Sequence, residues 1–236
     1  MNAPRELTFL LAGPERRLLR ALASRLPATV RPNHLTVLGV LAALGTGAAY
    51  ALSVRNPAWL WAASLGLALN WVGDSLDGTL ARVRGIERPR YGYYLDHLVD
   101  AVSVAAIGTG IGLSPYVDLW VALGLVVGYL MLSINIYLET TVFGVFELGY
   151  GRVGPTETRL MLIGANALLA TVPPGLFPVP TSTLANAAFI GILVVMALTL
   201  LTRVARNLTT LAKLEPQPQR RHAPGRGERP HATSRA

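Results

Sequence analysis

Six apolar runs of about 20 residues dominate this chain of 236 residues and limit the folds open to it. A run of that length crosses the hydrocarbon core of a bilayer as a helix. Only 14% of the residues are charged and the mean hydropathy is +0.43, which is typical of an integral membrane protein. We therefore predict an all-α integral membrane protein with six transmembrane helices, at residues 35–54, 58–81, 93–113, 117–138, 157–173 and 184–205.

The basic residues are distributed unevenly over the predicted loops. Twenty of the 21 lysines and arginines lie on one side of the bundle, and only Arg55 lies on the other. Cytoplasmic loops carry such an excess, so we predict a multi-pass protein of the cell (inner) membrane with both termini in the cytoplasm. The formal net charge of +8 then indicates contact with anionic lipid headgroups rather than with nucleic acid.

An amphipathic segment precedes the first span. Within residues 1–33, the stretch 15–26 places Leu18, Leu22 and Leu26 on one helical face and arginines on the others. This pattern predicts an N-terminal helix that lies in the cytoplasmic membrane interface. The alternative is an ordinary soluble cap helix.

The membrane domain is predicted to cover residues 34–212. Within it, small residues recur at four-residue spacing, as Gly39, Ala43 and Gly47 do, and such spacing lets helix backbones approach closely. Residues 213–236 are rich in proline, arginine and glycine, which predicts a basic, disordered cytoplasmic tail.

Four of the five aspartates lie close together in or beside two predicted spans, as Asp74, Asp77, Asp96 and Asp100. An ionised carboxylate in a transmembrane helix costs about 2.5–3.5 kcal/mol, so four of them require a bound positive group. Each pair is three or four residues apart and shares one helix face. The short connection between the spans predicts antiparallel neighbours whose carboxylates converge. Such hard oxygen ligands suit Mg²⁺ or Mn²⁺, and we expect two ions.

The residues after Asp77 are also informative. Gly78 is disfavoured inside a helix by about 1 kcal/mol relative to alanine, and its missing side chain makes room for a bulky ligand. Close helix packing is the alternative explanation. Arg82 adds a cation at the mouth of the site that is well suited to phosphate, although read alone it is one more arginine on the cytoplasmic side.

The complete string is Asp74-x2-Asp77-Gly78-x2-Ala81-Arg82-x9-Gly92-x3-Asp96-x3-Asp100. It resembles the signature of the CDP-alcohol phosphotransferase family, also called CDP-alcohol phosphatidyltransferases, at all eight defined positions. The resemblance extends from about residue 15 to about residue 210 and includes the lead-in Pro32-Asn33-x-Leu35-Thr36. It implies a homodimeric enzyme in which a CDP-linked donor loses CMP and its substituted phosphate passes to an acceptor alcohol.

The resemblance also implies a role for each residue of the string. The four aspartates would hold the divalent ions. Asp100 would in addition be the general base that deprotonates the acceptor. Gly78, Ala81 and Arg82 would contact the cytidine diphosphate.

His97 is a second candidate for the base, because its intrinsic pKa lies near the operating pH. The alternative is a side chain that faces away from the site, since adjacent helix positions point about 100° apart. The string Leu95-Asp96-His97 and the string Gly154-Pro155-Thr156-Glu157 resemble the choline/ethanolamine phosphotransferase branch, which uses a CDP-alcohol and diacylglycerol. Six spans instead resemble the branch that uses CDP-diacylglycerol, which we expect as the donor.

Further polar residues lie near the start of the fifth predicted span. Arg152 is a candidate phosphate contact, and Glu157 and Arg159 either orient a substrate or form a surface ion pair. Asn70 either hydrogen-bonds toward the site or links two helices.

Two alternatives to an enzyme are a divalent-cation transporter and a catalytically inactive scaffold. A divalent-cation transporter also carries aspartates inside the membrane, but predicted spans one and six have no carboxylate. Spans four and five have only Asp118 and Glu157, at their starts, so no carboxylate continues a path across the membrane. A catalytically inactive scaffold is opposed by the presence of all four aspartates.

Overall fold

The computed structural model of the chain describes residues 11–143, 154–171 and 178–215. Over these ranges it contains seven α-helices and no β-strand. The helices are α1 (Ala12–Arg25), α2 (Pro32–Leu52), α3 (Trp59–Val83), α4 (Pro89–Gly112), α5 (Leu119–Phe143), α6 (Pro155–Thr171) and α7 (Thr181–Leu214). Arg152 and most of the predicted tail lie outside the described residues.

Helices α2 to α7 overlap the six predicted spans. By length and composition, four of the described helices are apolar enough to cross a membrane, namely α2, α4, α5 and α7. Helix α6 has only 17 residues, and α3 carries Asn70, Asp74 and Asp77, which lower its hydropathy. The all-helical class is confirmed and the apolar helices indicate a membrane protein, whereas the number of six spans stays a prediction.

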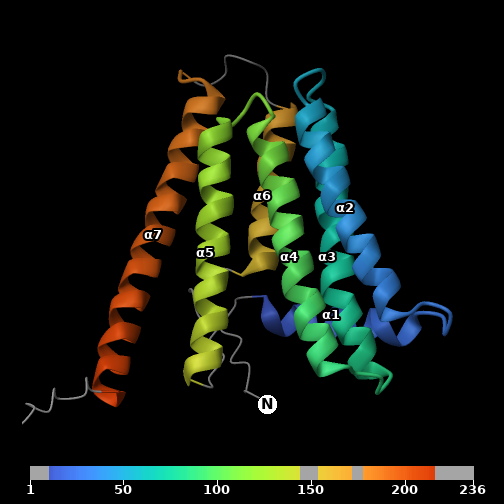
Figure 1. Ribbon diagram of the computed structural model, residues 1–236. Coiled ribbons are helices and arrows are strands. Elements are labelled where there is room, and N and C mark those ends of the chain that lie inside the picture. Colours follow the sequence, from blue (N-terminus) through green and yellow to red (C-terminus); the bar gives the residue numbers. More distant parts are fainter. Residues whose placement is uncertain (1–10, 144–153, 172–177, 216–236) are drawn as a thin grey trace, which may run out of the picture.

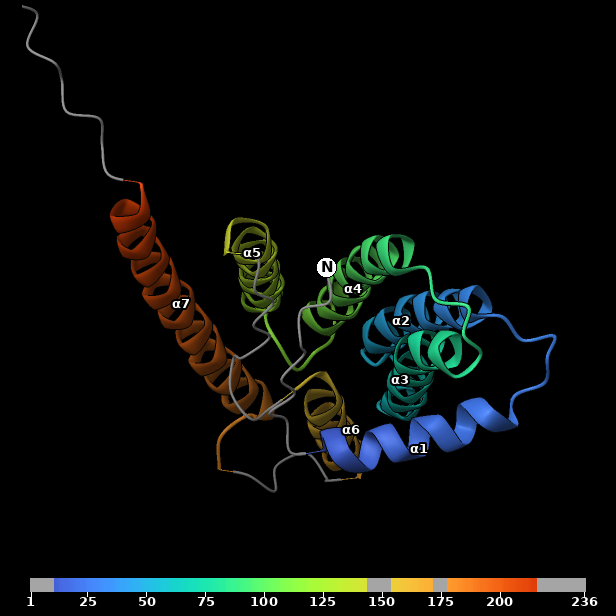
Figure 2. The same cartoon turned by 90° about the horizontal axis from the view of Figure 1, so that it is seen from below.

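Helices α2 to α7 pack one against the next along a curved line, which Figure 2 shows from below. Helix α6 packs against α3, α3 against α2, α2 against α4, α4 against α5, and α5 against α7. The short connection between α3 and α4 predicted that they are direct neighbours. That expectation needs correction, because α2 packs against both and is the principal neighbour of each.

Glycines on the facing helices let α2 pack closely against α3 and α4. A Cβ atom on Gly73 of α3 would lie 2.5–2.6 Å from the backbone N and Cα atoms of Gly39 on α2. On the other side of α2, a Cβ atom on Gly110 of α4 would collide with the backbone of Gly47. The small residues of α2 therefore lie at helix contacts inside the bundle, as their spacing predicted.

Helix α1 lies across the end of the bundle at which α3 ends and α4 begins (Figure 1). Its side chains Leu19 and Ala23 are buried in a cluster with Leu76 and Leu80 of α3. Leu22 and Leu26, two of the three leucines expected on one apolar face, pack against this cluster, whereas Leu18 is 50% exposed.

A buried polar cluster joins α5 to α7. Helix α5 continues past the predicted end of its span at residue 138, so Glu139 lies inside the helix and is buried. Its carboxylate accepts hydrogen bonds from Arg203 Nη2 at 2.7 Å, Asn135 Nδ2 at 2.7 Å and Asn207 Nδ2 at 2.6 Å. Glu139 lies beyond the predicted end of the span and was not expected inside the helix. Arg203 neutralises the charge of Glu139, so the pair links two helices.

The contact of α2 with α3 gives a first prediction. We expect Gly73→Ala to lower the free energy of unfolding by about 1–3 kcal/mol, because the new methyl group meets backbone atoms that cannot move aside cheaply. Gly45→Ala, on α2, is the matched control because a Cβ atom there has nothing within 4 Å. Thermal unfolding in detergent would measure both variants, and equal melting temperatures would contradict the packing described.

Candidate active site

Three carboxylates converge where α3 and α4 approach each other. Asp74 of α3 and Asp96 and Asp100 of α4 each contribute an oxygen, and these oxygens lie within 4.8 Å of one another. Asp96 and Asp100 are four residues apart, so both face α3 from successive turns of α4. The structure thus brings together three of the four aspartates predicted as metal ligands.

Asp77 lies one turn further along α3 and has other partners. Its Oδ2 atom accepts a hydrogen bond from Thr36 Oγ1 of α2 at 2.6 Å, and its Oδ1 atom accepts one from its neighbour Gly78 N at 2.5 Å. In this arrangement Asp77 is not part of the three-carboxylate cluster. Thr36 belongs to the lead-in that resembles the family, but no sequence pattern indicated its contact with Asp77.

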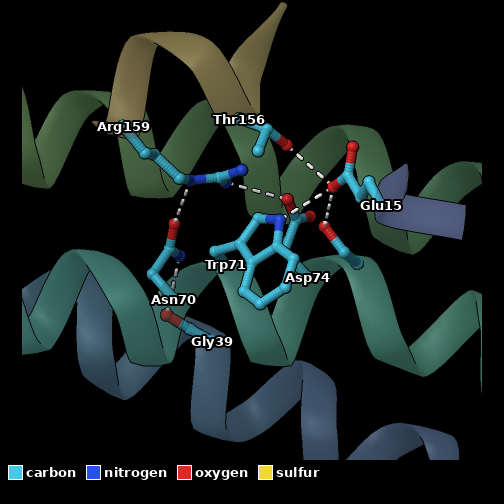
Figure 3. A network of polar contacts seen from close by, with 8 residues as sticks. Glu15, Gly39, Asn70, Trp71, Asp74, Thr156 and Arg159 are labelled. Carbon is cyan, nitrogen blue, oxygen red and sulfur yellow. Dashed lines mark hydrogen bonds and ion pairs between the residues drawn. The ribbon is translucent and has the colours of Figure 1, made fainter. Parts of the chain in front are cut away.

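Arg159 of α6 supplies a positive charge next to the cluster. Its Nη2 atom lies 2.8 Å from Asp74 Oδ2, and both side chains are largely buried. Its Nε atom donates to Asn70 Oδ1 at 3.1 Å, and Asn70 Nδ2 donates to the Gly39 carbonyl of α2 at 3.0 Å. Figure 3 shows this chain of contacts from α6 through α3 to α2. Asn70 was expected either to link two helices or to hydrogen-bond toward the site. It does both.

Gly78, Ala81 and Arg82 lie at the end of α3 that carries the aspartates. The Arg82 side chain folds back along its own helix, as long helical side chains do. Its guanidinium would be 3.4 Å from a Cβ atom on Gly78, and its Nη2 atom donates to Thr79 Oγ1 at 3.1 Å. Because Arg82 is exposed, its charge is available beside the gap left by the glycine.

His97 lies among aromatic rings. It stacks on Tyr137 of α5 at a centroid distance of 4.7 Å and meets Tyr93 edge-on at 4.1 Å. Its Nδ1 atom is 3.5 Å from Asp96 Oδ2. The ring therefore packs against α5 while it stays near one carboxylate of the cluster, and its role as a base remains a prediction.

The residues near the start of α6 have different surroundings. Arg159 reaches the aspartates, whereas the carboxylate of Glu157 accepts backbone N–H groups from Leu11 at 2.9 Å and Gly154 at 3.0 Å. Glu157 and Arg159 thus do not form the surface ion pair considered as one alternative. Arg152 lies outside the described residues.

A carboxylate of α1 lies close to the site and was missed. Glu15 Oε1 accepts hydrogen bonds from Trp71 Nε1 and Thr156 Oγ1, each at 2.7 Å, and from Ser75 Oγ at 3.5 Å (Figure 3). The sequence signal for Glu15 was a single acidic residue in the first turn of a helix whose other charged residues are basic. The hydrogen-bond partners of Glu15 could not be predicted, because they come from other helices and depend on the tertiary structure.

Comparison with known proteins agrees with the resemblance noted in the aspartate string. The chain matches the CDP-alcohol phosphatidyltransferase family over residues 29–211. It is also similar to an archaetidylinositol phosphate synthase of Pyrococcus horikoshii, with 30% identity over 165 residues, which cover 70% of this chain and 81% of the relative. The family predicted from the sequence is confirmed. The protein therefore belongs to the CDP-alcohol phosphatidyltransferase family.

Proposed function

We propose that the protein transfers a substituted phosphate group from a CDP-linked donor to an acceptor alcohol and releases CMP. The observation that carries this proposal is the convergence of three carboxylates beside Arg159, in a chain of this family. Phosphoryl transfer depends mainly on positioning and on electrostatic stabilisation, and a cluster of fixed charges provides both.

The carboxylates fit a divalent cation. Asp74, Asp96 and Asp100 offer hard oxygen ligands, and one arginine cannot balance three such groups when all are ionised. We assign this site to Mg²⁺ or Mn²⁺ and include Asp77, so that four carboxylates hold two ions. When bound, the ions would neutralise the pyrophosphate of the donor and polarise the phosphoryl group.

The side chains then have separate tasks. Gly78 and Ala81 leave room for the cytidine diphosphate, and Arg82 lies beside its phosphates. Asp100 accepts the proton of the acceptor hydroxyl as that oxygen bonds to phosphorus. The bond from phosphorus to the bridging oxygen breaks at the same centre, and CMP leaves with the electron pair. His97 is the alternative base.

Arg159 is proposed to orient a substrate phosphate, because its guanidinium already lies at the cluster. Arg152 is a second candidate phosphate contact. Glu157, first considered for substrate orientation, has carboxylate contacts that favour holding α1 on α6.

The proposed setting is the cytoplasmic face of the cell membrane. We propose that α2 to α7 all cross the bilayer and that α1 lies in the interface, with both termini cytoplasmic. The bias of basic residues supports this orientation. The family resemblance further implies a homodimer.

The donor is proposed to be CDP-diacylglycerol, with a small polar alcohol as acceptor. The similar protein of Pyrococcus horikoshii is named an archaetidylinositol phosphate synthase, which supports a lipid-linked donor and a polar acceptor. The alternative is transfer of a phospho-alcohol from a CDP-alcohol to diacylglycerol, favoured by the strings at His97 and at Gly154–Glu157.

The donor can be tested with purified protein in mixed micelles. We expect CMP release from CDP-diacylglycerol with one member of a panel of polar alcohols that includes inositol phosphate. Excess chelator should abolish the release, because the carboxylates then lose their counter-charge. Release from CDP-choline or CDP-ethanolamine alone, dependent on diacylglycerol, would reverse the donor assignment. Full turnover in chelator would contradict the metal site.

The aspartates can be tested by isosteric replacement. Asp96→Asn and Asp77→Asn should each lower the rate of CMP release by at least about three orders of magnitude, because charge and metal geometry are lost together. Arg159→Ala should have a smaller effect, mainly on substrate binding. The matched control is Asp118→Asn, an exposed aspartate in the α4–α5 connection, which should keep full activity. Equal, mild effects at Asp77, Asp96 and Arg159 would refute the roles proposed.

A further inference from the structure

Glu15 links the surface helix α1 to two helices of the site. Its Oε1 atom accepts three hydrogen bonds, two from Trp71 and Ser75 of α3 and one from Thr156 of α6. Trp71 and Thr156 are each 2.7 Å away, and the carboxylate is partly buried. An acidic residue in the first turn of a helix often only complements the helix dipole. Here the carboxylate instead points at side chains of other helices.

The donors to Glu15 lie one turn from the ion pair of the site. Trp71 precedes Asp74 by three residues on α3, and Thr156 precedes Arg159 by three residues on α6. Residues three apart are neighbours on a helix surface. The Glu15 carboxylate therefore bridges the same two helices as the pair of Asp74 and Arg159, directly beside it (Figure 3).

Among the described residues, the start of α6 is bonded to α3 by Arg159, which contacts Asn70 and Asp74. Helix α6 is 17 residues long and packs mainly against α3. Leu11, the residue before α1, adds a further bond to α6, since its backbone N donates to Glu157 Oε1 at 2.9 Å. Helix α1 is itself anchored on α3 by Leu19 and Ala23. It thus acts as a strap that joins the start of α6 to α3.

We infer that Glu15 is a positioning residue that sets the place of α6 against α3 and so keeps the Arg159 guanidinium at Asp74. The inference rests on the proposed function, because Arg159 is taken to orient a substrate phosphate. A displacement of about 1 Å in a group that positions a substrate can lower a rate by as much as 100-fold. Glu15 acts through Arg159 and touches no substrate itself.

The test compares two replacements of Glu15 by CMP release, with the donor and acceptor that the wild-type protein uses. Glu15→Ala removes the acceptor of all three bonds and should lower kcat/KM by about 10- to 100-fold. Glu15→Gln keeps an oxygen at that position and should stay within about threefold of wild type, since the bonds and not the charge carry the effect. Ser24→Ala is the control on α1, because Ser24 is exposed and bonds only to its own helix.

A double variant separates positioning from general stability. If Glu15 acts through Arg159, then Glu15→Ala combined with Arg159→Ala should be no slower than Arg159→Ala alone. If the rate losses of Glu15→Ala and Arg159→Ala instead multiply in the double variant, the inference is overturned. A fully active Glu15→Ala would overturn it as well. If Glu15→Ala does not elute as folded protein, Thr156→Val provides the same comparison with one bond removed. A wild-type protein that releases no CMP from any CDP-linked donor would refute the proposed function instead.

Discussion

The accumulation of negative charge among apolar helices is the constraint on which the rest of this structure depends. Three carboxylates within 4.8 Å of one another repel each other and resist removal from water. The fold compensates in part with Arg159, a partly buried arginine that reaches the cluster from α6. A divalent ion completes the compensation in our account. Three helices must therefore be held in fixed relative positions for the charges to balance.

Close packing of helix backbones holds part of this arrangement in place. Helix α2 packs against both α3 and α4, and paired glycines let its backbone touch theirs. On the same helix, the Thr36 hydroxyl donates a hydrogen bond to Asp77, and the Gly39 carbonyl accepts one from Asn70. Helix α2 contributes no charged residue to the site, yet it determines how far apart the two carboxylate-bearing helices lie.

Much of this arrangement follows from local sequence patterns. Apolar runs predicted the helices, and the spacing of Asp96 and Asp100 predicted a shared face. The patterns could not show which helix packs against which, because that depends on small residues that meet only in the folded bundle. The packing of α2 against both α3 and α4 was missed for this reason. Glu139 was missed because its predicted span ended one residue too early, and Glu15 because its partners Trp71 and Thr156 are distant in sequence.

The most direct test of the central claim is to locate the metal. Crystals of the protein grown with Mn²⁺ and a CDP-linked donor would give anomalous scattering from the ions. We expect one peak bonded to oxygens of Asp74, Asp96 and Asp100, and a second peak bonded to Asp77 after its carboxylate has turned away from Thr36. Anomalous peaks only elsewhere, or none in crystals of protein that turns over the same donor, would contradict the account.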